Sequence, residues 1–375
     1  MSNQQSNFNP DYEQEHPGEF LKETLEARGI KVVDLARRCG RPTKTISEII
    51  SGTTAITPET AIQFERALGE SADMWLGLQA TYELQEARKM AQTSIAGTDA
   101  KEWLKLFPIS DLVSNGYIHK KTKPSEKVEE LLAFFGVGSI SAWHSFWGEK
   151  LCLARFKQNQ HKSTSNGAVA AWIRKGELEA SQISTMSFDK RAFKAVLPEL
   201  RSLTQLEWSK AEQKLVEMCA NCGVAVVCLK DLKRTGLRGA ALWANKDKAV
   251  ILISDRFKSE EKTWFAFFHE AMHILHHSKK VTFWDLEGFE KSEVEIEKEA
   301  NEFAADLLVS KHDLQRFLVN HGRNITDAHK YAVTKFANDI GVSPGLFLER
   351  LQREKVASYA VRMSKTLKRK LEFAN

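Results

Sequence analysis

The sequence predicts a mainly α-helical protein whose C-terminal part is an α+β domain. Between residues 19 and 80, short amphipathic segments each end at a glycine, which is typical of a small bundle of helices. Near residue 208 the pattern changes to runs rich in Val, Ile and Ala that are typical of strands, and two long helical segments follow. The order of helix, strands and helices indicates an α+β arrangement.

A chain of 375 residues is long enough for two or three domains. Changes in polarity and periodicity divide it into five segments. We predict a disordered tail at 1–15, a five-helix bundle at 16–96, a helical middle region at 97–207, an α+β domain at 208–356 and a basic tail at 357–375. No motif within the middle region indicates a role for it.

Composition excludes several classes of protein. The 54 Lys and Arg residues against 49 Asp and Glu leave a positive charge too small to indicate nucleic-acid or membrane binding by itself. The N-terminus is polar and no apolar stretch approaches the roughly 20 residues of a membrane span, so we expect a cytoplasmic protein without membrane contact. Five unevenly spaced cysteines argue against a disulfide framework. Cys219 and Cys222 lack a second pair, which favours buried thiols over a metal or redox site.

The N-terminal bundle is expected to consist of four short helices and a longer polar one. The short helices run from Phe20, Val32, Thr43 and Thr57, each to a glycine, and the polar helix continues over 81–96. One apolar stripe per helix would face inward. These stripes contain Phe20, Leu21, Leu25, Val32, Leu35, Ala36, Ile46, Ile49, Ile50, Ile62, Phe64 and Leu68.

The second and third helices fit a helix-turn-helix pattern. The connection Cys39-Gly40-Arg41 is tight, and the helix that begins after Pro42 presents short polar side chains that would reach base edges in a major groove. Neighbouring basic side chains would neutralise phosphates. The alternative is an ordinary helical bundle with a solvated polar face. The candidate DNA-contacting residues are Arg38, Arg41, Thr43, Lys44, Thr45, Ser47 and Glu48.

The stretch "HPGEFLKETLEARGIKVVDLARRCGRPTKTISEIISGTTAITPETAIQFERALG" closely resembles the Xre-type repressor fold and, within it, the antitoxins of the HigA family. The resemblance covers about residues 16–80, and its most specific part runs from Arg41 to Pro58. It implies a homodimer that binds palindromic double-stranded operator DNA, usually at its own promoter. It also implies a cognate toxin as a partner.

The run "TWFAFFHEAMHILHH" contains an H-E-x-x-H pattern. His269 and His273 are a little more than one helical turn apart, so both imidazoles lie on one face and can bind one metal ion. Glu270 would then lie beside a metal-bound water rather than on the metal. The apolar neighbours suit a buried helix, and the alternative is an apolar core helix that happens to contain histidines.

A catalytic zinc site requires a third protein ligand and one open position. His276 is roughly 10 Å along the helix axis from His269, so we expect it to flank the cleft instead. In the acidic helix that follows, the 100° rotation per residue turns Glu297 towards the apolar face, Glu299 further from that face, and Glu302 into solvent. Helical geometry therefore favours Glu297 as the third ligand.

The H-E-x-x-H pattern followed by Glu297-x-x-Ala-Asn-x-Phe-Ala-Ala resembles the ImmA/IrrE family of zinc metallopeptidases, over about residues 208–355. The resemblance implies a zincin-like domain with a small sheet, with Zn²⁺ held by His269, His273 and Glu297. Glu270 would be the general base of peptide hydrolysis. The substrate would lie extended along the strand at 249–254. One departure is "LLVS", where the family usually has a proline, and this affects only a helix end.

These patterns predict a DNA-binding transcriptional regulator, either a HigA-like antitoxin or a phage-type repressor, whose zinc peptidase domain cleaves a regulatory protein. The alternative is a non-catalytic antitoxin or repressor whose zinc domain senses a signal or binds a toxin. The presence of Glu270 favours a catalyst, because a structural zinc site has no use for a base. The HigA-like N-terminal part favours the alternative.

Overall fold

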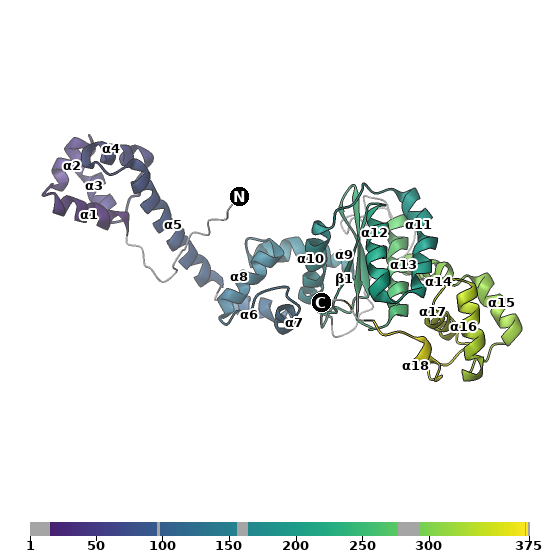
Figure 1. Cartoon of the computed structure of the whole chain (residues 1–375). Coiled ribbons are helices and arrows are strands. Elements are labelled where there is room, and N and C mark those ends of the chain that lie inside the picture. Colours follow the sequence, from purple (N-terminus) through teal and green to yellow (C-terminus); the bar gives the residue numbers. More distant parts are fainter. Residues whose placement is uncertain (1–15, 96–97, 156–163, 277–292, 372, 374–375) are drawn as a thin grey trace. The chain divides into compact units, whose positions relative to one another are not determined.

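The computed structural model describes residues 16–95, 98–155, 164–276, 293–371 and 373. The chain divides into two compact units, Met1–Thr98 and Asp99–Asn375, and the bar in Figure 1 gives the residue numbers of each part. The tail predicted at 1–15 and the predicted end of the bundle at residue 96 lie outside the described residues. The fold class predicted from the sequence is confirmed: a helical N-terminal unit precedes helices that surround a small sheet.

The first unit contains five helices around one core. Their bounds are α1 (Pro17–Ala27), α2 (Val32–Arg38), α3 (Thr43–Ile50), α4 (Pro58–Leu68) and α5 (Ala72–Ile95). Trp75 of α5 is fully buried and packs edge-on against Phe64 of α4, with ring centroids 5.3 Å apart. The expected inward stripes are correct except at Phe20 and Ile62, which are 38% and 42% exposed.

The second unit begins with helices rather than with the sheet. These helices are α6 (Thr98–Lys105), α7 (Ile109–Ser114), α8 (Pro124–Phe135), α9 (Ile140–Arg155), α10 (Asn166–Gln182), α11 (Lys190–Ser202) and, after a 3-10 turn (Leu203–Gln205), α12 (Trp208–Ala220). Phe193 and Leu197 of α11 lie in the same hydrophobic core as the sheet. The helices that we expected as a separate middle region therefore belong to the compact unit that contains the sheet.

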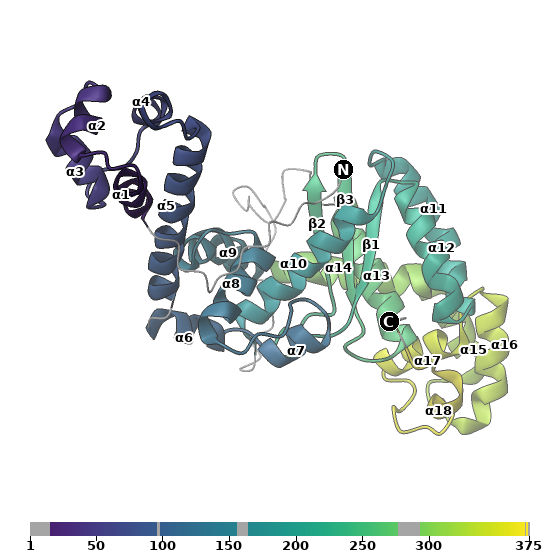
Figure 2. The same ribbon diagram turned by 60° about the vertical axis from the view of Figure 1, so that its left-hand side comes forward.

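Three strands form the sheet: β1 (Val224–Leu229), β2 (Gly239–Asn245) and β3 (Lys248–Ser254). Their spatial order is β1-β3-β2, with β1 parallel and β2 antiparallel to β3. Helix α10 covers one face of the sheet, and α12 and α13 (Glu260–His276) cover the other (Figures 1 and 2). Packing on the first face is close, since a Cβ built on Gly176 of α10 would lie 2.4 Å from Cδ1 of Leu252. β3 is accordingly buried on both faces.

The position of β3 corrects one expectation. We expected a substrate to pair along residues 249–254, but β3 is the middle strand and both of its edges are already paired with β1 and β2. In the described part of the chain, β2 pairs with β3 alone, so its other edge carries backbone N–H and C=O groups that a peptide can reach. Pairing with an extended peptide is therefore available at β2 and not at β3.

The helices after the sheet complete the second unit. Besides α13 they are α14 (Glu293–Leu308), α15 (Lys311–His321), α16 (Lys330–Asp339), α17 (Pro344–Arg353) and α18 (Ser364–Leu367), with a 3-10 turn (Asp327–His329) before α16. The segment that we expected as a basic tail packs against α13: Leu371 is 2% exposed, and the N–H of Glu260 donates to the carbonyl of Arg369. Among the described helices, none is long and apolar enough to cross a membrane.

Candidate metal centre and DNA-contacting surface

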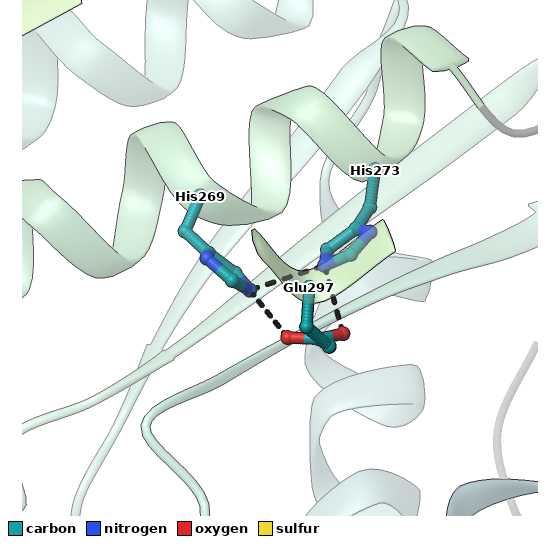
Figure 3. Close-up of side chains that lie close together, drawn as sticks. All are labelled: His269, His273 and Glu297. Atoms are coloured by element: carbon teal, nitrogen blue, oxygen red, sulfur yellow. Dashed lines mark hydrogen bonds and ion pairs between the residues drawn. The ribbon is translucent and has the colours of Figure 1, made fainter. Parts of the chain in front are cut away.

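Two histidines of α13 and one glutamate of α14 converge on one point (Figure 3). Nε2 of His269 lies 3.2 Å from Oε2 of Glu297, and Nε2 of His273 lies 3.4 Å from Oε1 of the same carboxylate. The two Nε2 atoms are 3.1 Å apart. The structure thus brings together the three residues that we predicted as ligands, and among the described residues they form a group that could hold a metal ion.

The spacing of these atoms suits one tetrahedral ion. Ligand atoms about 2.1 Å from a zinc ion at tetrahedral angles are about 3.4 Å from one another. The two Nε2 atoms are 3.1 Å apart, and each lies 3.2 or 3.4 Å from a different oxygen of Glu297, which is close to that value. Two imidazoles and one carboxylate are also a donor set that leaves a fourth position for water or substrate. The residues present therefore fit a catalytic type of zinc site.

Charges at the site are strongly coupled. Burial favours the neutral carboxyl of Glu297, but hydrogen bonds from His269 and His273 outweigh it and hold the pKa of Glu297 well below its usual range. Burial also opposes a charge on His269, yet the hydrogen bond to Glu297 and the charges of Glu270 and Glu297 raise the pKa of His269 above its usual value. The carboxylate is thus ionised at neutral pH, as a metal ligand must be.

Glu270 lies between α13 and the edge strand. Its side chain is 9% exposed, and it occupies the space that a side chain on Gly239 would fill. A Cβ built on Gly239 would lie 2.9 Å from Cγ and 2.9 Å from Oε1 of Glu270. The absence of a side chain at the start of β2 therefore lets the Glu270 carboxylate lie beside the strand edge that is open to a peptide.

The site opens into a cleft of about 1160 Å³ that contains all four predicted residues, His269, Glu270, His273 and Glu297. Glu302 is exposed, as expected, and lies on the rim. His276 is not among the described residues that line the cleft, and its ring contacts Phe303, with ring centroids 6.5 Å apart.

The sequence did not single out several residues that line the cleft. They come from β2, α13, α17 and two loops, so no local spacing connects them, although a glycine at the start of a strand signals close approach of another group. They are Arg238, Gly239, Lys262, Arg353 and Tyr359.

The cysteine pair lies in the hydrophobic core of the second unit. Cys219 and Cys222 are buried free thiols, and burial raises the pKa of each. A raised pKa keeps a thiol protonated and unreactive at neutral pH. The expectation of buried thiols is confirmed.

In the first unit, α2 and α3 form the expected helix-turn-helix geometry. Gly40 adopts a left-handed conformation (φ +62°), and the N–H of Arg41 donates to the carbonyl of Ala36, which ends α2 and turns the chain. Ile46 and Ile49 are fully buried on the inner side of α3. The opposite side of α3 is therefore the side that is available to DNA.

The predicted DNA-contacting residues differ in exposure. Thr43, Lys44 and Ser47 are exposed on α3, while Thr45 and Glu48 are partly buried; Arg38 is exposed at the end of α2. The Lys44 ammonium lies 3.7 Å from the Glu48 carboxylate. Nε of Arg41 donates to the Gln63 amide oxygen at 2.5 Å, so α4 holds this arginine in place.

Fold and site define a helix-turn-helix DNA-binding regulator joined to a domain of metallopeptidase type. Residues 21–75 match a helix-turn-helix family model, and residues 224–352 match the Peptidase_M78 model, the IrrE N-terminal-like domain. The uncharacterized HTH-type transcriptional regulator YddM of Escherichia coli (strain K12) is 35% identical over 78 residues, which are 21% of this chain and 83% of that protein. The chain belongs to the HTH-type transcriptional regulators and carries an IrrE-like peptidase domain.

Further similarities concern the same N-terminal region. Virulence-associated protein A of Dichelobacter nodosus is 39% identical over 71 residues, 18% of this chain and 70% of that protein. The solved structure of Pseudomonas aeruginosa antitoxin HigA with the higBA promoter has 30% identity, covers 22% of this chain and 92% of its own, and has a TM-score of 0.22. The resemblances to a helix-turn-helix regulator and to an IrrE-type peptidase, inferred from the sequence, are confirmed.

The charges of Glu297 and His269 predict that the stability of the metal-free protein depends on pH. The contribution of Glu297, whose pKa is lowered, should be lost as pH falls below about 4.3, and that of His269, whose pKa is raised, as pH rises above about 6.5. Between these limits, Glu297→Gln should lower the free energy of unfolding by about 1 to 2 kcal/mol. Urea unfolding in chelator from about pH 2 to 9 measures this, and a pH-independent difference would contradict the assignment.

Proposed function

We propose that this regulator binds operator DNA through residues 16–80 and hydrolyses a peptide bond of a regulatory protein at a zinc site made by His269, His273 and Glu297. The observation that carries the proposal is the convergence of two imidazole Nε2 atoms and the two oxygens of one carboxylate, with separations of 3.1 to 3.4 Å. The buried carboxylate of Glu270 beside them, in a domain of peptidase type, supports catalysis rather than a structural zinc site.

Each residue has a definite task in this mechanism. Bound zinc would supply Lewis-acid activation of water and of the substrate carbonyl. Glu270 accepts the proton of the attacking water and delivers it to the leaving amide nitrogen, so that an acid and an amine are the products. The outer edge of β2 holds the substrate extended by backbone hydrogen bonds, which brings the scissile bond next to Glu270.

The DNA-binding unit suggests what the peptidase regulates. A homodimer on a palindromic operator would repress a promoter, and the HigA-like character of residues 16–80 points to the chain's own promoter and to a toxin as partner. Cleavage of a repressor, of that toxin or of the chain itself would change expression. Because such a regulator acts on chromosomal or phage DNA, we assign it to the cytoplasm.

The first test is metal content. The full chain, purified without chelator, should hold about one zinc ion, and alanine at His269, His273 or Glu297 should remove most of it. Elemental analysis measures this. Glu299→Ala, two residues from Glu297 on the same helix, is the matched control and should keep the zinc; loss of zinc from this variant instead of Glu297→Ala would move the ligand.

The second test separates a catalyst from a binding module. Glu270→Gln should keep zinc and DNA binding but lower proteolysis by about 10² to 10⁴, because an amide cannot accept the proton of water at neutral pH. Mass spectrometry would compare fragments after incubation with operator-bound protein, an adjacent toxin and cell lysate. Identical fragments from both proteins, with equal repression, would leave the zinc domain as a sensing or toxin-binding module.

The third test concerns DNA recognition. The full chain should bind a palindrome upstream of its own gene, with affinity that falls steeply as salt rises. Replacing Thr43 and Glu48 by alanine should relax sequence preference, because both lie on α3, whereas Arg38→Ala should weaken binding to all sequences alike. Fluorescence anisotropy with operator and scrambled duplexes measures both effects. Equal affinities for the two duplexes at physiological salt would rule out specific repression.

A further inference from the structure

One end of the cleft is a cationic, aromatic-lined surface formed by Arg238, Lys262 and Arg353 with Phe257 and Phe265. We propose that this cationic end binds an acidic side chain of the substrate, two or three residues to the carboxyl-terminal side of the scissile bond. The inference rests on the proposed peptidase function and specifies the class of peptide that the site accepts.

Aromatic rings hold the three cations in place. The Arg238 guanidinium lies 4.9 Å and the Lys262 ammonium 4.5 Å from the centre of the Phe257 ring, and the Arg353 guanidinium lies 3.7 Å from the centre of Phe265. Stacking on a ring restricts a long side chain without neutralising it. The charges are therefore ordered and still able to bind an anion.

These charges lack a counterion within the described residues. No carboxylate there forms an ion pair with any of the three cations, because the two nearby glutamates are engaged elsewhere: Glu354 with Arg350 at 3.1 Å, and Glu349 with Lys368. Loss of solvation and the charges of Arg350 and Arg238 lower the pKa of Arg353, whereas the charges of Glu349 and Tyr359 raise it. Loss of solvation is the largest of these effects, and an anion that binds in the cleft would compensate it.

The cationic end lies two to three residues of an extended peptide away from the metal site. Along α13, Phe265 lies four residues and Lys262 seven residues before His269, or about 6 and 10 Å at 1.5 Å per residue. An extended peptide advances about 3.3 Å per residue, so these distances correspond to its second and third residues from the scissile bond.

The edge strand β2 indicates the direction in which the substrate chain would run through the cleft. Gly239 abuts Glu270 and so marks the position of the scissile bond along β2, while Arg238 immediately precedes it. A peptide that pairs antiparallel to β2 runs towards lower residue numbers, and antiparallel pairs are the more stable kind. The residues that follow its scissile bond therefore lie towards Arg238 and the other cations.

Phosphinic peptides test this inference without requiring turnover. A phosphinate in place of one amide binds the zinc and fixes the register, and alanine-based hexapeptides would carry a single Glu or Gln at each position before or after it. With the zinc-loaded full chain, Glu at the second or third following position should bind about tenfold more tightly than Gln. At the preceding positions Glu and Gln should bind equally. Competition anisotropy measures these affinities.

Charge-removing variants identify the groups responsible. Combining Lys262→Gln with Arg353→Gln should reduce the Glu preference to less than about twofold. Lys210→Gln removes an equal charge from an exposed site on α12 outside the cleft and should leave the preference unchanged. Equal Glu and Gln affinities at every following position, or a preference confined to the preceding positions, would overturn the inference.

Zinc analysis of the same samples distinguishes failure of the acidic-peptide inference from failure of the proposed peptidase function. Zinc present with no preference for Glu rejects the acidic-peptide inference and leaves the peptidase proposal standing. A chain that holds no zinc and binds no phosphinate rejects both. A Glu preference with zinc present but no cleavage of any protein supports the binding surface and removes the catalytic claim.

Discussion

The contact between two histidines of α13 and the Glu297 carboxylate of α14 is the constraint on which the candidate site depends. Two imidazole nitrogens and the two oxygens of a carboxylate stay this close only if both helices are held in place, because separating them would leave buried polar atoms without partners. The fold provides that rigidity. The inner face of α13 packs on the sheet through Phe267, Phe268 and Ala271, which are all fully buried.

Opposite faces of α13 thus have opposite chemistry. The apolar face determines where the helix lies, and the face that carries Lys262, His269 and His273 lines the cleft. The start of β2 adds the last requirement, because a side chain larger than hydrogen at position 239 would occupy the place of the Glu270 carboxylate. The candidate base and the two histidines consequently lie on one helix that packs directly on the strand with the free edge, and α14 supplies Glu297.

The candidate DNA-contacting surface and the candidate metal centre lie in different units. Residues in the first unit form their own core around Phe64 and Trp75, and the metal centre draws all of its residues from the second unit. Helices α10 and α11 precede the sheet in sequence yet pack with it, so they serve the peptidase-type domain rather than a third domain. In the proposed function, covalent linkage would keep the peptidase-type domain at a high local concentration near the bound operator.

The spacing of residues along the sequence was sufficient to predict much of the fold and of the candidate site. Features that depend on helical periodicity within about one or two turns can be predicted from a single sequence. They include the pairing of His269 with His273, the inward turn of Glu297, the left-handed Gly40 and the buried faces of the short helices. The middle position of β3 could not be predicted from the sequence. The order of strands in a sheet depends on how the connecting segments pack in three dimensions. Likewise Arg238, Lys262 and Arg353 meet only after the chain folds, since contacts between distant residues leave no periodic trace in the sequence.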